Sequence, residues 1–371
     1  MATFQQLIKS GAKRRDQIVF LIISGLLFSV YFYTAVPSVY DGDSGELSAV
    51  VTDWGLAHPT GFPLYIILAK VFSTLVPIGD IAYRLNIFSA AATALAIAIF
   101  YLALRNFGIS NMASFSSSLI LGFGRTIWSH AGAARVYSIN LLVAAILLFL
   151  FAKYLKKPDK KFIFYYTLAL GLGFGSHILI ILMVLPLLSM LYQNGWHNTK
   201  RVLLLLLIPL SQYVYIPIAY ARNRIVNFGE INSLSGLFHY IAQRDFAYKT
   251  VGRDLNNSKG FLGEMAGLFA GELTFVFLVI AVVGFWVLWH RKRRLGIMFL
   301  SIIIFNILIM YFYGNSWDLR VLFRYFFTSY MLMAVLIAVA FDFLLTKISA
   351  SGQRQGTYFL MTLILLAPFV I

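Results

Sequence analysis

Four carboxylates and one histidine lie close together in the stretch from Tyr40 to Pro63, which reads YDGDSGELSAVVTDWGLAHPTGFP. The carboxylates are Asp41, Asp43, Glu46 and Asp53, and the histidine is His58. An ionised carboxylate can accept the proton of a hydroxyl group, and two carboxylates can hold a divalent cation. Because ionised groups are costly in hydrocarbon and apolar runs flank the stretch, these side chains must face water or a protein cavity. We therefore interpret the stretch as a candidate functional site.

Asp43 has two interpretations. In the first, Asp43 or Ser44 caps a helix whose Glu46 can reach back to the cap, Asp43 has no further role, and Glu46 and Asp53 face water. The residues Leu47, Val50, Val51 and Trp54 would then form the apolar stripe of an amphipathic helix on the membrane surface. In the second, Asp41 and Asp43, separated by one glycine at the mouth of a span, act as a base or bind a cation. His58, set between Gly and Pro residues, is expected in a rigid turn, either bonded to backbone or facing the site.

The composition identifies the chain as an integral membrane protein. Of its 371 residues 60% are hydrophobic and only 12% are charged, whereas an average soluble domain has roughly 25% charged residues. The net charge of +16 does not call for nucleic acid, since Lys and Arg gather on the cytoplasmic loops of multispanning proteins. The absence of cysteine excludes disulfides and thiol chemistry. The basic N-terminus precedes an apolar run without a small-residue cleavage site, which predicts a retained span and not a signal peptide.

Apolar runs of about 20 residues, the length that crosses a bilayer, predict an all-α polytopic protein with about 11 transmembrane helices. The runs are 17–40, 85–104, 106–124, 136–152, 162–199, 202–221, 273–290, 295–317, 325–341 and 355–371. The run 162–199 has double length, and we expect it to split at the glycine-rich sequence GLGFGSH, 171–177. The run 62–79 is also apolar, but two prolines and Lys70 favour an interfacial helix on the outer face.

The basic clusters orient these predicted spans. With a cytoplasmic N-terminus, the clusters KYLKKPDKK at 153–161 and RKRR at 291–294 both lie inside, as the positive-inside bias requires. The outer loops are then 41–84, 222–264 and the short 314–324. Arginines on these loops are either solvated or bind an anion such as a lipid phosphate, which suits the guanidinium fork. A zinc site is not expected, because the six histidines show no ligand spacing and there is no cysteine.

These residues resemble the signature of the GT-C membrane glycosyltransferases, in the branch related to protein O-mannosyltransferases. The first outer loop of that branch reads DSGEL, then AHPPGYPLY, then a PIG segment. This chain has DSGEL at 43–47, AHPTGFPLY at 57–65 and PIGDIAYRLN at 77–86. Looser matches are WSHAGAARVYSIN at 128–140, GLGFGSH at 171–177 and IAQRDFAY at 241–248. The resemblance covers about residues 15–250 and is most specific in the first loop.

The resemblance implies an inverting glycosyltransferase that moves a sugar, such as mannose, from a polyprenyl-phosphate donor to an acceptor hydroxyl. An acidic residue of the first outer loop acts as the base, which here is Asp43, with Glu46 and His58 beside it. The resemblance also suggests Asp41, His177 and Tyr137 as cavity-lining residues, and the candidates for binding the donor phosphate are Arg244, Arg324 and Arg84. No cofactor is required, and the alternative is a divalent cation held by Asp41 and Asp43.

The implied partners are the polyprenyl-phosphate sugar donor, membrane lipids, and an acceptor protein, glycan or lipid, without nucleic acid. The protein Ser or Thr hydroxyl is one such acceptor. We expect the site on the outer face of a multi-pass protein of a prokaryotic inner membrane. The chain divides into a GT-C catalytic membrane module, 1–264, and C-terminal transmembrane helices, 265–371. It ends at Ile371 inside an apolar stretch, where either the last span stops or the sequence has been cut.

One position departs from the resemblance, and two other functions remain open. Relatives usually have Glu in an EVYSLN motif, where this chain has Arg135. The reversal of charge indicates either a changed acceptor or a different phosphate contact. A transporter or flippase of lipid-linked sugars would also use a carboxylate pair and a basic lipid site, but should show paired repeats or charges near the midplane. A noncatalytic membrane scaffold would use the outer loops as a binding surface.

Overall fold

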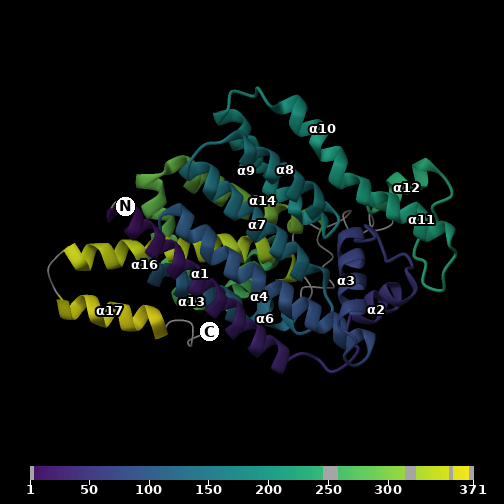
Figure 1. The fold of residues 1–371 in the computed structure, drawn as a ribbon, viewed down its shortest axis with the longest axis horizontal. Coiled ribbons are helices and arrows are strands. Elements are labelled where there is room, and N and C mark those ends of the chain that lie inside the picture. The colour runs from purple at the N-terminus through teal and green to yellow at the C-terminus, as the bar shows by residue number, and fades with distance from the viewer. Residues whose placement is uncertain (1–3, 245–257, 314–322, 351–353, 367–371) are drawn as a thin grey trace.

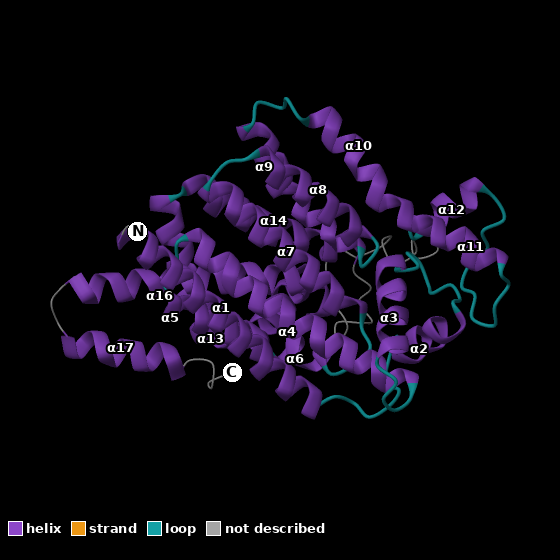
Figure 2. Ribbon diagram, viewed as in Figure 1, coloured by secondary structure: helices purple, strands orange, loops and turns teal. Residues whose placement is uncertain are grey.

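The computed structural model describes residues 4–244, 258–313, 323–350 and 354–366 (Figure 1). Over these ranges the chain forms helices and connecting loops, with one isolated bridge in place of a sheet (Figure 2). Seven described segments are long and apolar enough to cross a membrane: Lys13–Tyr33, Ile81–Phe107, Val136–Lys156, Thr199–Ala221, Gly263–Arg291, Arg293–Phe312 and Phe323–Ala350. The predicted all-α polytopic membrane fold is confirmed, whereas the count of about 11 spans is not.

The central bundle contains the long helices of the chain. These are α1 (Phe4–Tyr33), α4 (Ile81–Phe107), α7 (Val136–Lys156), α13 (Ser258–Arg291), α14 (Arg293–Tyr313) and α16 (Phe327–Ala350). Helix α4 packs along α7 and α1, and α16 packs along α13 and along α5 (Asn111–Phe123). Ala90, Ala94 and Ala98 form a buried stripe on α4, and such small side chains let neighbouring helix backbones approach closely. The bundle therefore depends on close packing between its helices.

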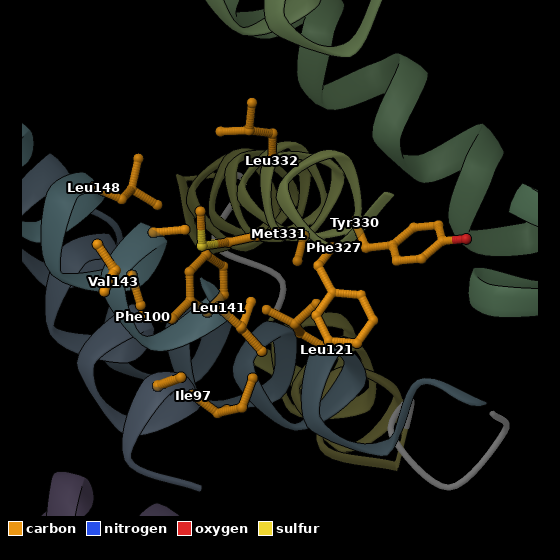
Figure 3. Close-up of a cluster of buried hydrophobic side chains, with 14 of the residues drawn as sticks. Ile97, Phe100, Leu121, Leu141, Val143, Leu148, Phe327, Tyr330, Met331 and Leu332 are labelled. Carbon is orange, nitrogen blue, oxygen red and sulfur yellow. The ribbon is translucent and has the colours of Figure 1, made fainter. Parts of the chain in front are cut away.

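The centre of the bundle is a cluster of buried apolar side chains (Figure 3). Phe100 from α4, Leu141 from α7, Leu121 from α5 and Met331 from α16 are each at most 1% exposed. Because lipid tails are as apolar as these side chains, close packing, and not the hydrophobic effect, holds such helices together. The cluster joins these four helices, of which α7 carries the lining residue Tyr137 at its first turn.

The shorter helices follow the breaks in the apolar pattern. The double run splits as predicted, into α8 (Lys160–Phe174), η1 (Ile178–Met183) and α9 (Val184–Gln193). The run 106–124 forms only α5, whose 13 residues are fewer than the roughly 20 needed to cross a bilayer. Helix α10 (Thr199–Leu210) continues through η2 (Ser211–Val214) into α11 (Tyr215–Ala221), and α17 (Arg354–Leu366) follows α16. Several expected spans are thus short helices that leave the count unconfirmed.

The remaining elements gather at one end of the bundle, at the right of Figure 1. They are α2 (Ser44–Asp53), α3 (Pro63–Leu75) and α12 (Leu234–Ile241), with α6 (Arg125–Ala131) and η5 (Phe323–Phe326) in the connections nearby. Helix α3 has 13 residues, so the run 62–79 does not form a spanning helix, as expected. Lys70, expected to extend toward the membrane interface, donates from its Nζ to the Thr52 carbonyl at 2.9 Å. This hydrogen bond connects α3 to α2.

The second predicted outer loop packs on the first. The Leu56 amide donates to the Val226 carbonyl at 3.0 Å, and the Phe228 amide donates to the Leu56 carbonyl at 3.0 Å. A Cβ on Gly55 would lie 2.2 Å from the Val226 oxygen, so the close approach requires glycine. Residues 245–257 of this loop, and 314–322 of the third loop, lie outside the described residues. The first loop is therefore held by the bundle on one side and by 226–228 on another.

Glu272 is a buried carboxylate in α13 that caps α6. Its Oε2 accepts a hydrogen bond from the Thr126 amide at 2.7 Å, and the residue is 2% exposed. Two residues later the backbone of α13 is broken by Thr274, whose φ is 59°. A carboxylate suits the amide-rich N-terminus of a helix, and α6 leads directly into the turn that carries Arg135.

We expect Glu272→Ala to destabilise the protein by about 1–3 kcal/mol, because the buried Thr126 amide would lose its acceptor. The apparent melting temperature of the detergent-solubilised protein measures the effect. Glu264→Ala is the matched control, since Glu264 is exposed on the same helix. Glu272→Gln, which keeps an acceptor oxygen, should lie between the two. Equal melting of the two alanine variants would contradict this role.

Candidate active site

A cavity of about 290 Å³ opens beside the N-terminus of α2. Its lining comes from the first loop, the start of α7, the turn after α8, the end of α14, and η5. The lining residues are Asp43, His58, Pro59, Phe62, Tyr137, His177, Ile178, Leu179, Gln243, Ile309, Met310, Arg324 and Tyr325. The site draws on both predicted parts of the chain, 1–264 and 265–371, and so is not built by the first alone.

Asp43 lies between two guanidinium groups, one buried and one partly buried. Its Oδ2 is 3.7 Å from Arg324 Nη1 and 3.9 Å from Arg135 Nη1. The side chains of Arg135 and Arg324 are only 9% and 17% exposed. Asp43 does occupy the N-cap position of α2, but its side chain makes no capping hydrogen bond. The interpretation of Asp43 as merely a helix cap is therefore wrong, because the carboxylate is directed to the arginines instead.

Arg135 reaches Asp43 because of the backbone around it. The residue stands immediately before α7 with extended φ and ψ of −144° and 134°, and its Nη2 donates to the Asp41 carbonyl. Gly42 has a φ of +65°, and a Cβ there would lie 2.7 Å from Arg135 Nη1. Only glycine combines that left-handed backbone with the space that the guanidinium takes. The glycine between the two aspartates thus makes room for the Arg135 guanidinium.

Glu46 and His58 form a hydrogen-bonded pair. His58 Nδ1 lies 2.9 Å from both carboxylate oxygens of Glu46, and the His58 amide donates to Glu46 Oε1 at 2.6 Å. The predicted capping box is absent here, since Glu46 bonds to the turn at 58 and not to the start of α2. Because Nδ1 must carry a proton to donate to the carboxylate, the pair fixes the ring orientation and tautomer at the cavity wall. The alternative in which Glu46 faces water is wrong.

Part of the cavity wall is aromatic. The His177 ring stacks on Phe62 at a centroid distance of 6.3 Å and lies 5.2 Å from the Tyr137 ring. Arg324 lies over Tyr137 and Tyr325, at 5.5 and 5.4 Å from their centroids. Burial, and then the charge of Arg324, lowers the pKa of His177 to about 3. His177 is therefore neutral at physiological pH, and its Nδ1 accepts from the Leu179 amide at 3.3 Å.

His130 lies behind this wall in a similar environment. Its ring makes edge contacts with Tyr137 and Phe327, at 5.7 and 5.5 Å. Burial, followed by the charge of Arg135, lowers its pKa to about 3. His130 and His177 therefore differ from His58, whose ring contacts the Glu46 carboxylate.

The remaining predicted residues lie elsewhere. Arg84 donates to the carbonyls of Ser73 and Gly79 at 3.1 and 3.0 Å, and so holds the turn before α4. The exposed Arg244 contacts His239 Nε2 at 2.7 Å. Neither arginine lines the cavity, although the neighbouring Gln243 does.

Two acids of the first loop also serve the loop itself. The Asp41 carboxylate accepts from the Gly42 amide at 2.7 Å and is not among the lining residues. Asp53 accepts from the Ile225 amide at 3.2 Å and lies 3.9 Å from Arg224, so it holds the second segment against the first. In the described part of the chain no three His, Cys, Asp or Glu side chains are grouped to hold a metal ion. A cation between Asp41 and Asp43 stays an untested alternative.

Sequence reasoning did not find several lining residues. Phe62 and Tyr325 form much of the aromatic wall, and Ile309 and Met310 come from the end of α14, far along the chain. For Tyr325 the adjacency to Arg324 was the available signal. For Arg135 the reversed charge in the matched motif was the signal, and the structure places that guanidinium against Asp43.

The comparisons with known proteins agree with this architecture. Residues 43–202 match the family model of the protein O-mannosyl-transferase TMEM260 N-terminal domain. The chain is 27% identical over 250 residues to protein O-mannosyl-transferase TMEM260 of Mus musculus, covering 64% of this chain and 35% of the mouse protein. It is 24% identical over 252 residues to the Dictyostelium discoideum protein of that name, covering 62% of this chain and 30% of that protein. The chain thus spans about a third of the length of these curated relatives.

A solved structure shares the fold. The crystal structure of ArnT from Cupriavidus metallidurans bound to undecaprenyl phosphate aligns with a TM-score of 0.61 at 15% identity, covering 88% of this chain and 60% of that one. At this identity the likeness concerns the fold alone. The predicted resemblance to the O-mannosyltransferase-related branch of the GT-C family, and the GT-C type of fold, are confirmed.

Proposed function

We propose that this chain is the membrane module of an inverting glycosyltransferase, which moves a sugar from a polyprenyl-phosphate donor to an acceptor hydroxyl. The observation that carries the proposal is the position of Asp43 at the cavity, beside the partly buried Arg324 and the buried Arg135. A glycosyl transfer of this kind needs a proton acceptor and an electrostatic partner for the leaving phosphate. The cavity offers both within one ion cluster, and the relatives' names agree with sugar transfer.

The proposed reaction proceeds by direct displacement. The acceptor oxygen attacks the anomeric carbon, the new carbon–oxygen bond forms on one face, and the bond to the phosphate oxygen breaks on the other. The hydroxyl proton passes to the Asp43 carboxylate, and the polyprenyl phosphate leaves with the bonding electrons. Arg324 stabilises the charge that grows on the phosphate, which is the kind of interaction that lowers the barrier most.

Formal charges support the assignment of two arginines to one aspartate. Arg135, Arg324 and ionised Asp43 together carry one net positive charge, which the single negative charge of a donor phosphodiester neutralises. After transfer Asp43 is protonated, and the leaving monophosphate carries up to about two negative charges. These again match the two arginines. The net charge of the cluster and the phosphate therefore stays at zero across the reaction. This balance explains why an arginine suits position 135, where relatives usually have glutamate.

The positions of the basic residues support a site on the outer side of the membrane. Helices α4, α7 and α16 begin at the cavity end and finish at the other end of the bundle. There Arg105 pairs with Asp16 at 3.0 Å, and Asp342 accepts from the Ser110 amide at 2.8 Å. Both basic clusters, 153–161 and 291–294, follow the far ends of α7 and α13. The positive-inside bias then favours the outer face as the side of the proposed site.

The test is a transfer assay on the purified chain. Polyprenyl-phosphate mannose labelled in the sugar is supplied with peptides rich in Ser and Thr, and with glycan and lipid acceptors, and mass spectrometry identifies the product. Release of polyprenyl phosphate together with a glycosylated acceptor is the expected result. Translocation of the intact labelled lipid across a proteoliposome, without cleavage, would instead support a transporter.

Glu46→Gln is expected to lower the transfer rate roughly 10- to 100-fold, a loss smaller than that of the base itself. Glutamine keeps an acceptor for His58 but removes the negative charge that holds the ring.

The matched control for this substitution is Thr52→Val, since Thr52 is exposed on the same helix. A variant Glu46→Gln with the transfer rate of Thr52→Val would show that the pair only shapes the loop.

A further inference from the structure

A second cavity, of about 180 Å³, lies at the end of the bundle opposite the candidate active site. It is enclosed by the last turn of α4, the junction of α13 with α14, and the second half of α16. Its lining residues are Phe107, Gly108, Ile109, Val287, Leu288, Arg291, Lys292, Leu295, Phe299, Val335, Val339 and Asp342. Most of this surface is apolar, and Phe299 and Val335 at its base are at most 1% exposed.

The charged residues of this cavity lie on its exposed side. Arg291 and Lys292 are exposed, and the Arg291 guanidinium lies over the Phe343 ring, 5.3 Å from its centroid. Asp342 brings the one negative charge among the lining residues, and its Oδ1 already accepts from the Ser110 amide at 2.8 Å. The positive charges of Arg291 and Lys292 therefore lie beside an apolar cavity. The Asp342 carboxylate is already hydrogen-bonded to the Ser110 amide, immediately before α5.

We propose that this second cavity binds an anionic phospholipid, with its phosphate at Arg291 and Lys292 and a section of one acyl chain in the hollow. The proposal does not depend on the sugar-transfer function.

The combination of features favours a lipid over a free anion. An apolar cavity of about 150 Å³ accommodates a benzene-sized group, so 180 Å³ admits a section of one chain but not a whole lipid. A free phosphate would gain nothing from the apolar lining. Basic pockets between transmembrane helices on the cytoplasmic side are suited to anionic lipid head groups, and the RKRR cluster at 291–294 supplies that charge.

The test is lipid binding to the full chain in detergent, measured by native mass spectrometry. Palmitoyl-oleoyl phosphatidylglycerol is titrated against phosphatidylcholine with the same acyl chains. The double variant Arg291→Gln/Lys292→Gln is compared with Lys156→Gln/Lys157→Gln, which removes the same charge from exposed residues at the C-terminal end of α7. Val339→Phe fills the hollow without a change of charge, and Val339→Leu replaces it if that protein does not remain monodisperse.

The expected result is preferential binding of phosphatidylglycerol, weakened about 10- to 30-fold by the first double variant and less than about threefold by the second. The Val339 variant should weaken both lipids. Equal binding of phosphatidylglycerol by the two double variants, or unchanged binding by the filled cavity, would overturn the proposal. Displacement of phosphatidylglycerol by equimolar undecaprenyl phosphate would overturn the choice of a phospholipid as occupant.

Discussion

Asp43→Asn is expected to reduce sugar transfer by at least 10²-fold, and up to about 10⁴-fold, in a protein that remains folded. Asparagine has the size of aspartate but cannot take the acceptor proton. The substitution also removes a negative charge 3.7 Å from Arg324, so the donor phosphate should bind as well as before or more tightly. The loss should therefore fall on kcat and not on the KM for the donor. Initial rates of transfer at several donor concentrations separate the two quantities.

Two comparisons make this result specific to Asp43. Asp41→Asn should retain most of the activity, because the Asp41 carboxylate bonds to the Gly42 amide outside the cavity lining. Asp43→Glu keeps a base but moves it by one methylene, and should recover part of the rate. Transfer by Asp43→Asn within threefold of the unsubstituted protein would refute Asp43 as the base and leave the Glu46–His58 pair as the next candidate.

Arg324→Gln is expected to lower kcat/KM by about 10²- to 10³-fold, with a raised KM for the polyprenyl-phosphate sugar. A buried guanidinium that meets a phosphate in a site of low polarity is among the stronger electrostatic contacts in proteins. Its removal leaves the cluster without net positive charge, since only Arg135 and Asp43 remain. Arg324→Lys should restore the charge but not the paired donors, and so should recover only part of the loss.

The controls for Arg324 test the other predicted phosphate ligands at the same time. Arg84→Gln and Arg244→Gln are expected to change the donor KM by less than about threefold, because neither side chain lines the cavity. Arg222→Gln, an exposed arginine that follows α11, sets the baseline. A donor KM that rises in Arg244→Gln but not in Arg324→Gln would move the phosphate site to the second outer loop.

Much of the fold was readable from the apolar pattern. The long runs at 85–104, 136–152 and 325–341 became buried bundle helices, and the glycine-rich break at 171–177 became the turn after α8. Hydropathy could not set the number of spans. A run such as 106–124 is apolar because it is buried between helices, and burial in protein and burial in lipid select the same residue types.

The candidate site was only partly readable. The density of polar residues at 41–58 identified the stretch, and the family resemblance favoured Asp43. The sequence could not show whether that carboxylate caps α2 or faces a cavity, because both roles begin with the same residue before the same helix. The roles of the arginines could not be predicted from the sequence, because Arg84 and Arg324 carry the same charge in predicted outer loops. The structure shows that Arg84 donates to the carbonyls of Ser73 and Gly79 and so has a structural role.

The sequence by itself determined that this is a helical membrane protein with a polar stretch, 41–58, set between apolar runs. It also determined the GT-C resemblance and the preference for Asp43. Tertiary structure alone decided which charges meet there. Arg135 and Arg324 are 189 residues apart in number, yet both lie within 4 Å of one oxygen of Asp43. Such an encounter depends on the packing of α7 against α16 and on the space left by Gly42, because ion pairs form by distance and not by order along the chain.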